Sequence, residues 1–297
     1  MTAVRDNPRR HWLRLATRIA GLMLHQPGRT SDLVRDSYDR IADGYDSAWT
    51  DHMRDLSSAM LDRLTPPPGA TCLDLSCGTG LITAELARRT GGACTGVDAS
   101  AGMLAVARRR RVARCRFVHA DVLYYLRRQP RGSVDVVTCG WALGYSRPAA
   151  VIAQTARVLR PGGRVGIIDN SLFSLAGVLW ASLQAFAERP AALQHAAQVR
   201  FLPHSAALAA LMRGHGLGVR ERWDGARTYE VSNGTTAVQR LQSTGAAAGF
   251  EFAVGPEDRE AVFARFAELI ERQRRGDGGV PVTHRYLAAV GVKRCAI

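Results

Sequence analysis

The stretch CLDLSCGTG, residues 72–80, decides the fold that we expect for this chain of 297 residues. An apolar run ends in Asp74 and then gives way to small residues, including Gly78 and Gly80. Such a run is typical of a buried strand, and glycines placed after it allow positive φ angles and bring a ligand close to the backbone. The stretch therefore predicts a core strand that ends in a ligand-binding turn and leads into a helix.

The segments around this turn alternate between short β-rich runs and helical stretches. We expect strands at 71–75, 93–97, 115–119, 134–139 and 163–169, followed by two more at 217–223 and 284–292. Alternation of this kind predicts an α/β fold with a doubly wound, mostly parallel seven-stranded sheet and helices on both faces.

This pattern predicts that the chain has four parts. Residues 1–65 are expected to form N-terminal helices that cover the cofactor, and 66–170 to form the ligand-binding α/β core. An apolar stretch rich in Leu, Phe and Trp lies between the fifth and sixth strands and predicts a helical lid insertion over 171–203. Residues 204–297 would complete the sheet and the substrate pocket.

Composition limits the partners that we expect. The formal net charge is +14, but Lys293 is the only lysine and the arginines are spread along the chain, as in proteins of GC-rich genomes. We therefore expect no nucleic acid partner. No apolar run is long enough to cross a membrane, and the six cysteines show no metal-like spacing. We expect a cytoplasmic protein without a bound metal or an integral membrane contact.

Acidic residues at the strand ends identify the ligand. The turn lacks the third glycine of a dinucleotide site, and no lysine follows it as in a phosphate-binding loop. Asp74 suits an ammonium group, Asp98 ends the second strand where a carboxylate can bind ribose hydroxyls, and Asp121 follows the third strand within reach of an adenine amino group. Ammonium, ribose and adenine in that order describe S-adenosylmethionine.

Five stretches in the same order resemble the class I S-adenosylmethionine-dependent methyltransferases, which have a Rossmann-like fold. They are LDLSCGTG (73–80), GVDAS (96–100), HADV (119–122), VDVVTCGWALGY (134–145) and VLRPGGRVGIID (158–169). SYDRIADGYD (37–46) is similar to a signature of ubiquinone/menaquinone C-methyltransferases and of malonyl-carrier-protein O-methyltransferases. The final GGVPVTHRYLAAVGVK (278–293) resembles the last strand of the second group.

The resemblance implies roles for particular residues. The methionine end of the cofactor would be held by Asp74, Gly78 and Gly80, and the ribose by Asp98, with Ala99 and Met103 nearby. Asp121 and Val122 would frame the adenine, while Tyr38 and Tyr45 would close over the sulfonium. Cys139 and Trp141 would lie where cofactor and acceptor meet.

The acceptor is less well specified. The candidate catalytic residues are Tyr45, Asp169 at the end of the fifth strand, and His195 and His204 in or after the lid. Trp141, Phe173, Trp180 and Phe186 are candidates for the substrate pocket. Aromatic and aliphatic side chains in the lid favour a hydrophobic or aromatic small molecule, methylated on carbon, oxygen or nitrogen in bacterial specialised metabolism.

Other functions stay open at this point. The resemblance of the last strand and the basic surface allow methylation of an anionic or carrier-bound acyl group at its carboxyl oxygen. An RNA or protein methyltransferase is less favoured, because TCGWALGY lacks the motif used for exocyclic amines of nucleic acids. A non-catalytic binding protein is also less favoured.

An amphipathic helix over 9–25 could lie on a membrane, cap the core or join copies into a homo-oligomer, and we expect the last.

Overall fold

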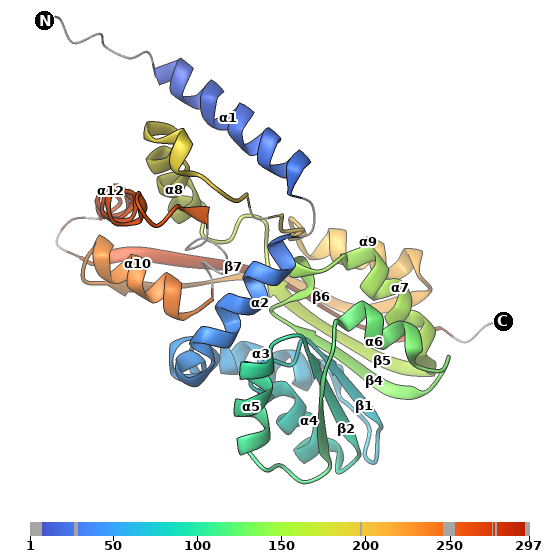
Figure 1. Cartoon of the computed structure of the whole chain (residues 1–297). Coiled ribbons are helices and arrows are strands. Elements are labelled where there is room, and N and C mark those ends of the chain that lie inside the picture. Colours follow the sequence, from blue (N-terminus) through green and yellow to red (C-terminus); the bar gives the residue numbers. More distant parts are fainter. Residues whose placement is uncertain are drawn as a thin grey trace, which may run out of the picture. The chain divides into compact units, whose positions relative to one another are not determined.

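The computed structural model describes residues 8–26, 29–196, 198–245, 253–274, 276 and 278–294. Its chain forms two compact units (Figure 1). The helical unit combines Met1–Ser37, Leu175–Gln198 and Arg227–Thr283, and the α/β unit combines Tyr38–Ser174, Val199–Ala226 and His284–Ile297. These units join distant segments, so they cut across the expected boundaries at residues 65, 170 and 203, which stay predictions.

A sheet of seven strands carries the α/β unit, as expected. The strand order is β3-β2-β1-β4-β5-β7-β6. Strands β1 to β5 are parallel where they pair, and β7 runs antiparallel to β5. The strands are β1 (Cys72–Leu75), β2 (Cys94–Asp98), β3 (Cys115–His119), β4 (Val134–Gly140), β5 (Leu159–Asn170), β6 (Leu217–Val231) and β7 (Val280–Lys293).

Helices cover both faces of this sheet (Figure 1). One apolar cluster joins α3 and α4 to the strands, and another joins α6, α7 and α9 to the opposite face. Because both faces are covered, β1 is buried along its whole length, as is usual for a parallel sheet. The helices are α3 (Asp51–Leu64), α4 (Leu81–Thr90), α5 (Ala101–Arg109), α6 (Val122–Arg128), α7 (Pro148–Val158) and α9 (Ser205–Gly214).

Short helical turns connect these elements at the side of the sheet where the parallel strands end. They are the 3₁₀ turns η1 (Ala42–Gly44) and η3 (Leu143–Tyr145) and the π-helical turn η2 (Asp46–Thr50). The loops that follow β1, β2, β4 and β5 lie at this edge, where ligands bind in doubly wound sheets.

The helical unit has its own apolar core. Leu15, Phe186, Leu241 and Phe266 are buried in it, each from a different helix. Its helices are α1 (Pro8–His25), α8 (Ala176–Glu188), the 3₁₀ turn η4 (Pro190–Ala192), α10 (Gly234–Ser243) and α12 (Arg259–Glu271), together with the first part of α2 (Arg29–Ile41). The expected lid segment 171–203 contains α8 and η4. None of the described helices is both long and apolar enough to cross a membrane.

Candidate functional site

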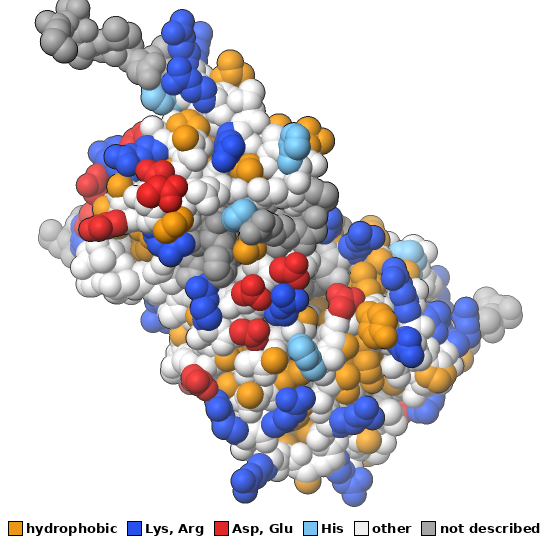
Figure 2. All heavy atoms as spheres, in the orientation of Figure 1, with side chains coloured by type: hydrophobic (Ala, Val, Ile, Leu, Met, Phe, Trp, Pro, Cys, Tyr) orange, Lys and Arg blue, Asp and Glu red, His pale blue; other side chains and the backbone are white. Residues whose placement is uncertain are grey.

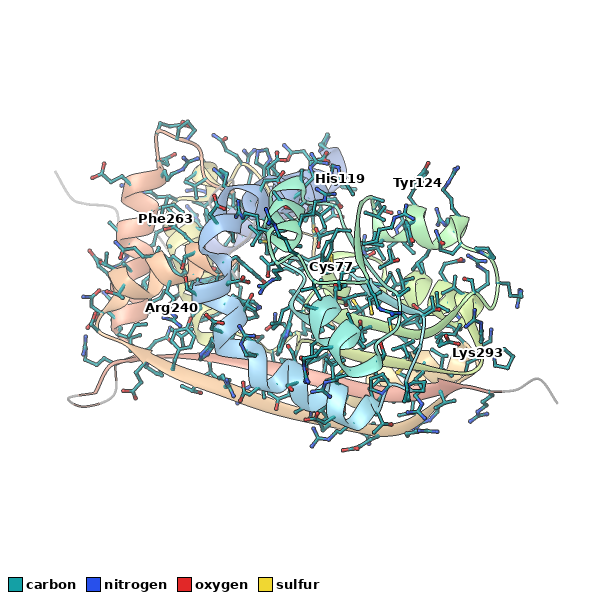
Figure 3. All side chains as sticks on the ribbon, turned by 90° about the horizontal axis from the view of Figure 1, so that it is seen from below. Cys77, His119, Tyr124, Arg240, Phe263 and Lys293 are labelled. Atoms are coloured by element: carbon teal, nitrogen blue, oxygen red, sulfur yellow. The ribbon has the colours of Figure 1, made fainter. Side chains whose placement is uncertain are left out.

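The turn after β1 borders open space. Ser76, Gly78 and Gly80 have positive φ angles of 52°, 53° and 79°. A Cβ atom on Gly80 would lie 2.9 Å from the Phe117 ring, whereas one on Gly78 would meet nothing within 4 Å. Gly80 is therefore required by packing, and Gly78 leaves its backbone open to a ligand. Figure 3 marks this turn by Cys77.

Asp98, at the end of β2, faces the same turn. Its Oδ2 accepts a hydrogen bond from the Gly78 amide, and its Oδ1 accepts one from the Ser100 amide, both at 2.8 Å. Burial raises the pKa of Asp98, although these amides oppose the shift. Each carboxylate oxygen accepts more than one hydrogen bond, so Asp98 retains acceptor capacity for ligand hydroxyls.

Asp74 lies beneath the turn and braces it. Its oxygens accept hydrogen bonds from the hydroxyls of Thr83 in α4 and Thr138 in β4, both at 2.7 Å. Burial raises the pKa of Asp74 to about 6. The side chain thus ties β1 to α4 and β4, and its predicted contact with the methionine end of the cofactor is not tested by this geometry.

Four aromatic rings gather near these acids. The ring centroids of Tyr38 lie 5.8 Å from Tyr45 and 6.1 Å from Tyr145, and Tyr145 lies 5.3 Å from Phe201. Burial raises the pKa of both Tyr38 and Tyr45, and the nearby charge of Asp98 adds to both shifts. The tyrosines therefore stay neutral, and their ring faces can stabilise a cation such as a sulfonium.

Asp169 is the next-to-last residue of β5 and contacts the turn η3, which contains Tyr145. Its Oδ2 accepts a hydrogen bond from the Gly144 amide at 2.7 Å, and its Oδ1 accepts one from the Asn170 amide at 2.8 Å. Burial raises the pKa of Asp169 to about 7 despite these bonds. A carboxyl group with this pKa is half ionised near neutral pH and can take up a proton.

Two further predicted residues follow β4 and have core contacts. Cys139 is buried, and burial raises the pKa of its thiol well above the usual value, with added effects of Asp169 and Asp74. Trp141 has a positive φ of 62°, and its indole N–H donates to the Ser57 hydroxyl at 2.9 Å. Its predicted contact with substrate stays a prediction.

The expected adenine region is also built from ordered turns. Asp121 caps α6, because its Oδ1 accepts a hydrogen bond from the Tyr124 amide at 2.8 Å, and Val122 after it is buried. Met103 is buried, with its amide bound to the Ser100 hydroxyl. The exposed Ala99 keeps its carbonyl 2.9 Å from His119 Nε2. These residues lie just after β2 and β3 or in the helices that follow them, and their contacts with the cofactor stay predictions.

The predicted acceptor residues do not all fall in one unit. In the α/β unit, Phe173 is exposed and His204 caps α9 by accepting a hydrogen bond from the Ala207 amide. In the helical unit, Phe186 is buried, His195 hydrogen-bonds with Gln26 at 2.6 Å, and the Trp180 ring stacks on Trp12. Tyr45 and Asp169 are therefore the two catalytic candidates that lie by the aromatic cluster.

Sequence reasoning missed the acids that hold Tyr38 and Tyr45 in place. Asp39 Oδ1 accepts hydrogen bonds from the Ser100 hydroxyl at 2.5 Å and from the Gly102 amide at 2.8 Å. Asp46 accepts one from the Thr79 hydroxyl at 2.5 Å and pairs with Arg110. We call residues 37–46 the cover segment, because these two acids fix it to the turns after β2 and β1.

Tyr145 and Phe201 were also missed. Tyr145 ends the quoted stretch VDVVTCGWALGY, so its place after β4 was a usable signal, whereas Phe201 stands in a segment without a motif. None of the described residues forms a group of three or more His, Cys, Asp or Glu side chains that could hold a metal ion.

Comparison with known proteins agrees with this geometry. Residues 72–163 match a methyltransferase domain family. A demethylmenaquinone methyltransferase of Beutenbergia cavernae is 31% identical over 239 residues, which cover 75% of this chain and 90% of the relative. The nocamycin O-methyltransferase of Saccharothrix syringae is 33% identical over 44% of this chain, and the match spans about half of that relative's length (48%).

Solved structures share the fold. The YcgJ protein of Bacillus subtilis superimposes with a TM-score of 0.55 and 19% identity over 81% of this chain and 98% of that protein. Fold, turn and relatives together define a methyltransferase on a Rossmann-like sheet. The chain belongs to the class I S-adenosylmethionine-dependent methyltransferases, and it is an enzyme with S-adenosylmethionine as its cofactor.

The residues present fit this cofactor. The open side of Gly78, the remaining acceptor capacity of Asp98 and the aromatic cluster match an amino acid backbone, a ribose and a sulfonium, respectively. Which residue contacts which part of the cofactor stays a prediction.

Proposed function

We propose that the enzyme methylates a hydrophobic or aromatic small molecule in bacterial specialised metabolism, with Asp169 as the general base. The observation that carries the proposal is the raised pKa of Asp169, about 7, next to the aromatic cluster. A carboxylate of this basicity suits an acceptor that must lose a proton, such as a phenol or an enol.

The cofactor supplies a methyl group bound to a positively charged sulfur. The protein contributes orientation and water exclusion, since Tyr38, Tyr45 and Tyr145 place neutral rings around the site. With the cofactor bound, the acceptor oxygen or carbon would receive this methyl group, and a carboxylate oxygen of Asp169 would take up the proton that the acceptor loses. The amides of Gly144 and Asn170 hold that carboxylate in place.

The relatives support the acceptor class. One carries the name of a demethylmenaquinone methyltransferase and another that of a nocamycin O-methyltransferase, and both are bacterial. An anionic or carrier-bound acceptor and a cytoplasmic location stay finer proposals. Assembly of copies through the N-terminal helix also stays a prediction. A vesicle flotation experiment can distinguish it from binding of the same helix to phospholipid.

The test is methyl transfer from labelled cofactor to a panel of phenols, enols, naphthoquinols and acyl carrier proteins. Wild-type enzyme should label a phenol or enol, and Asp169→Asn should reduce the rate by about 100-fold or more while S-adenosylhomocysteine binds as before. Asp62→Asn, an exposed carboxylate paired with Arg89, is the control and should keep the rate. Labelling of carrier proteins alone, or full activity of Asp169→Asn, would contradict the proposal.

A further inference from the structure

Helix α1 has two apolar sides, and only one of them faces the core. Leu15 and Leu22 are buried in the apolar core of the helical unit, where α1 packs on α8 and η4. Leu13 and Leu24 are 66% and 77% exposed. A helix turns by about 100° per residue, so Leu13, Ala20 and Leu24 share one outer side of α1.

Helix α8 adds a second exposed apolar strip. Leu179, Trp180 and Leu183 are 50%, 54% and 37% exposed, and their spacing places them on one side of the helix. The Trp180 ring stacks on Trp12 of α1 with centroids 5.3 Å apart and planes 14° from parallel. This stack joins the strip on α8 to α1. We call the outer side of α1 together with this strip the α1–α8 surface.

The charged side chains of α1 itself are all basic. Residues 8–31 contain no Asp or Glu, whereas Arg9, Arg10, Arg14 and Arg18 all lie on α1. Figure 2 shows blue and orange side chains along α1 and no red ones. The surface therefore pairs exposed Leu and Trp with arginine, as amphipathic helices do that lie in a membrane interface.

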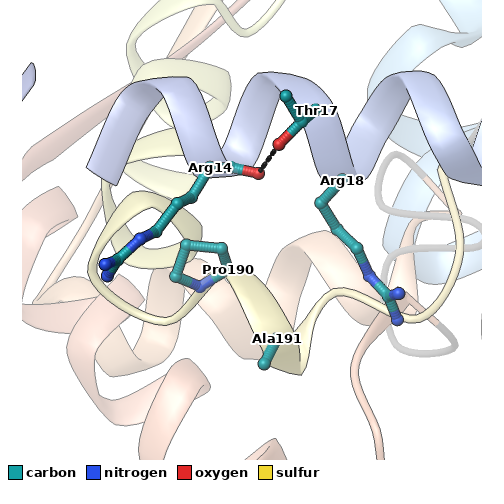
Figure 4. A pocket seen from close by; sticks show the side chains of 5 residues that line it. All are labelled: Arg14, Thr17, Arg18, Pro190 and Ala191. Atoms are coloured by element: carbon teal, nitrogen blue, oxygen red, sulfur yellow. Dashed lines mark hydrogen bonds between the residues drawn. The ribbon is translucent and has the colours of Figure 1, made fainter. Parts of the chain in front are cut away.

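A hollow on one flank of α1 lies between two of its arginines. Arg14, Thr17 and Arg18 of α1 and Pro190 and Ala191 of η4 line it (Figure 4). Arg18 Nε donates to the Leu193 carbonyl at 2.8 Å, which holds its guanidinium at the rim of the hollow. The Thr17 hydroxyl donates to the Arg14 carbonyl at 2.9 Å, so the two guanidinium groups are the suitable partners for a phosphate group.

We propose that the α1–α8 surface docks on anionic phospholipid, with Leu13, Leu24 and Trp180 in the interface and a headgroup phosphate in the hollow beside Arg14 and Arg18. A second copy of the chain fits less well. In a two-fold symmetric contact the same side of α1 would meet itself, and arginines would face arginines. Anionic lipid offers both the apolar layer and the opposite charge. The proposal does not depend on the identity of the methyl acceptor.

The experiment is flotation of the full chain with vesicles of phosphatidylglycerol or of phosphatidylcholine. Wild-type protein should float with phosphatidylglycerol, should bind phosphatidylcholine far more weakly, and should be released as salt rises. Leu13→Gln with Leu24→Gln, and Arg10→Gln with Arg14→Gln, should each weaken binding. We expect a loss of about fivefold for each arginine removed.

Matched controls come from the α/β unit. Tyr124→Gln removes an exposed ring, and Arg127→Gln removes an exposed guanidinium, both on α6. Both controls should float like the wild type, and thermal unfolding shows whether each variant is folded. Failure of the wild type to float, or equal flotation of all folded variants, overturns the proposal. It is also overturned if Leu13→Gln with Leu24→Gln changes the particle mass without vesicles, since the surface is then an interface between copies.

Discussion

At the scale of single residues, Ser76 is strained where the neighbouring turn residues are not. Its φ of 52° lies in the left-handed region, which costs a residue with a Cβ atom about 1–2 kcal/mol, whereas Gly78 and Gly80 adopt such angles freely. Ser76→Gly should relieve this strain, although glycine also gives the unfolded chain more conformational entropy. The free energy of unfolding should therefore rise by about 1 kcal/mol or less.

This gain should raise the thermal midpoint by roughly 2 °C in a scan of the cofactor-free protein. Ser146→Gly is the control, because Ser146 has a φ of −112°, so glycine relieves nothing there and should lower the midpoint. Equal effects of the two substitutions would show that the positive φ of Ser76 carries no strain.

Asp169 should set the pH dependence of catalysis. Its pKa of about 7 means that the carboxylate is protonated in acid and ionised in base. A general base acts only when ionised, so kcat/KM for a phenol acceptor should rise with pH, bend near pH 7 and then level off. Initial rates across this range check the prediction. A flat profile in the wild type, or the same bend in Asp169→Asn, would assign the base to another group.

At the scale of elements, cofactor affinity should depend on the contacts that hold the cover segment 37–46 in place. Asp39 accepts a hydrogen bond from the Gly102 amide in the first turn of α5, where the helix dipole favours an acid, and Asp46 binds Thr79 in the turn that carries Gly78. Asp39→Asn and Asp46→Asn each weaken a charge-assisted contact that holds Tyr38 and Tyr45 over the site. Titration calorimetry should show S-adenosylmethionine binding weakened by about tenfold or more.

Asp36→Asn is a matched control for this element, because Asp36 lies on the same helix as Asp39 and pairs with the exposed Arg35. It should leave cofactor binding unchanged. Gly102→Ala tests the contact from the other side, since its Cβ would lie 2.8 Å from the Asp39 carbonyl oxygen. Wild-type affinity in both Asp39→Asn and Gly102→Ala would show that the cover segment does not contribute to binding.

At the scale of the whole molecule, the sequence predicts the sheet better than its surroundings. Strand 115–119 coincides with the structure, and the strands expected at 71–75, 93–97 and 134–139 agree with it to within one residue at each end, because short apolar runs are local signals. Strand β6 extends to Val231, beyond the expected end at 223, because its alternating exposed residues mark a one-sided strand that a search for apolar runs misses.

The candidate site also contains residues that the sequence predicts and residues that it does not. The place of Gly78, Asp98 and Asp121 in the fold was predictable, since a single turn and three strand ends bring them to one edge of a parallel sheet, and their contacts with the cofactor stay predictions. Asp39 and Asp46 were not, because their partners Gly102 and Thr79 lie far along the chain and only tertiary packing brings them together. The grouping of α1, α8, α10 and α12 into one unit was missed for the same reason.

Buried acids should make the folded protein less stable as the pH rises. Burial raises the pKa of Asp74 to about 6 and that of Asp169 to about 7, from ordinary values near 3.8. Between about pH 4 and 7 the folded state therefore binds more protons than the unfolded state. The free energy of unfolding must then fall with rising pH across that window and level off above it, by up to a few kcal/mol.

Asp169→Asn removes one of these titrations, so it isolates the effect from all other charges. Its thermal midpoint relative to the wild type should increase from pH 5 to pH 8, because the wild type must ionise one more buried carboxyl group than the variant. Asp62→Asn, at an exposed carboxylate, should show a constant difference over the same range. If the difference between Asp169→Asn and the wild type is also constant, Asp169 has an ordinary pKa in the folded protein, and its assignment as the general base loses its basis.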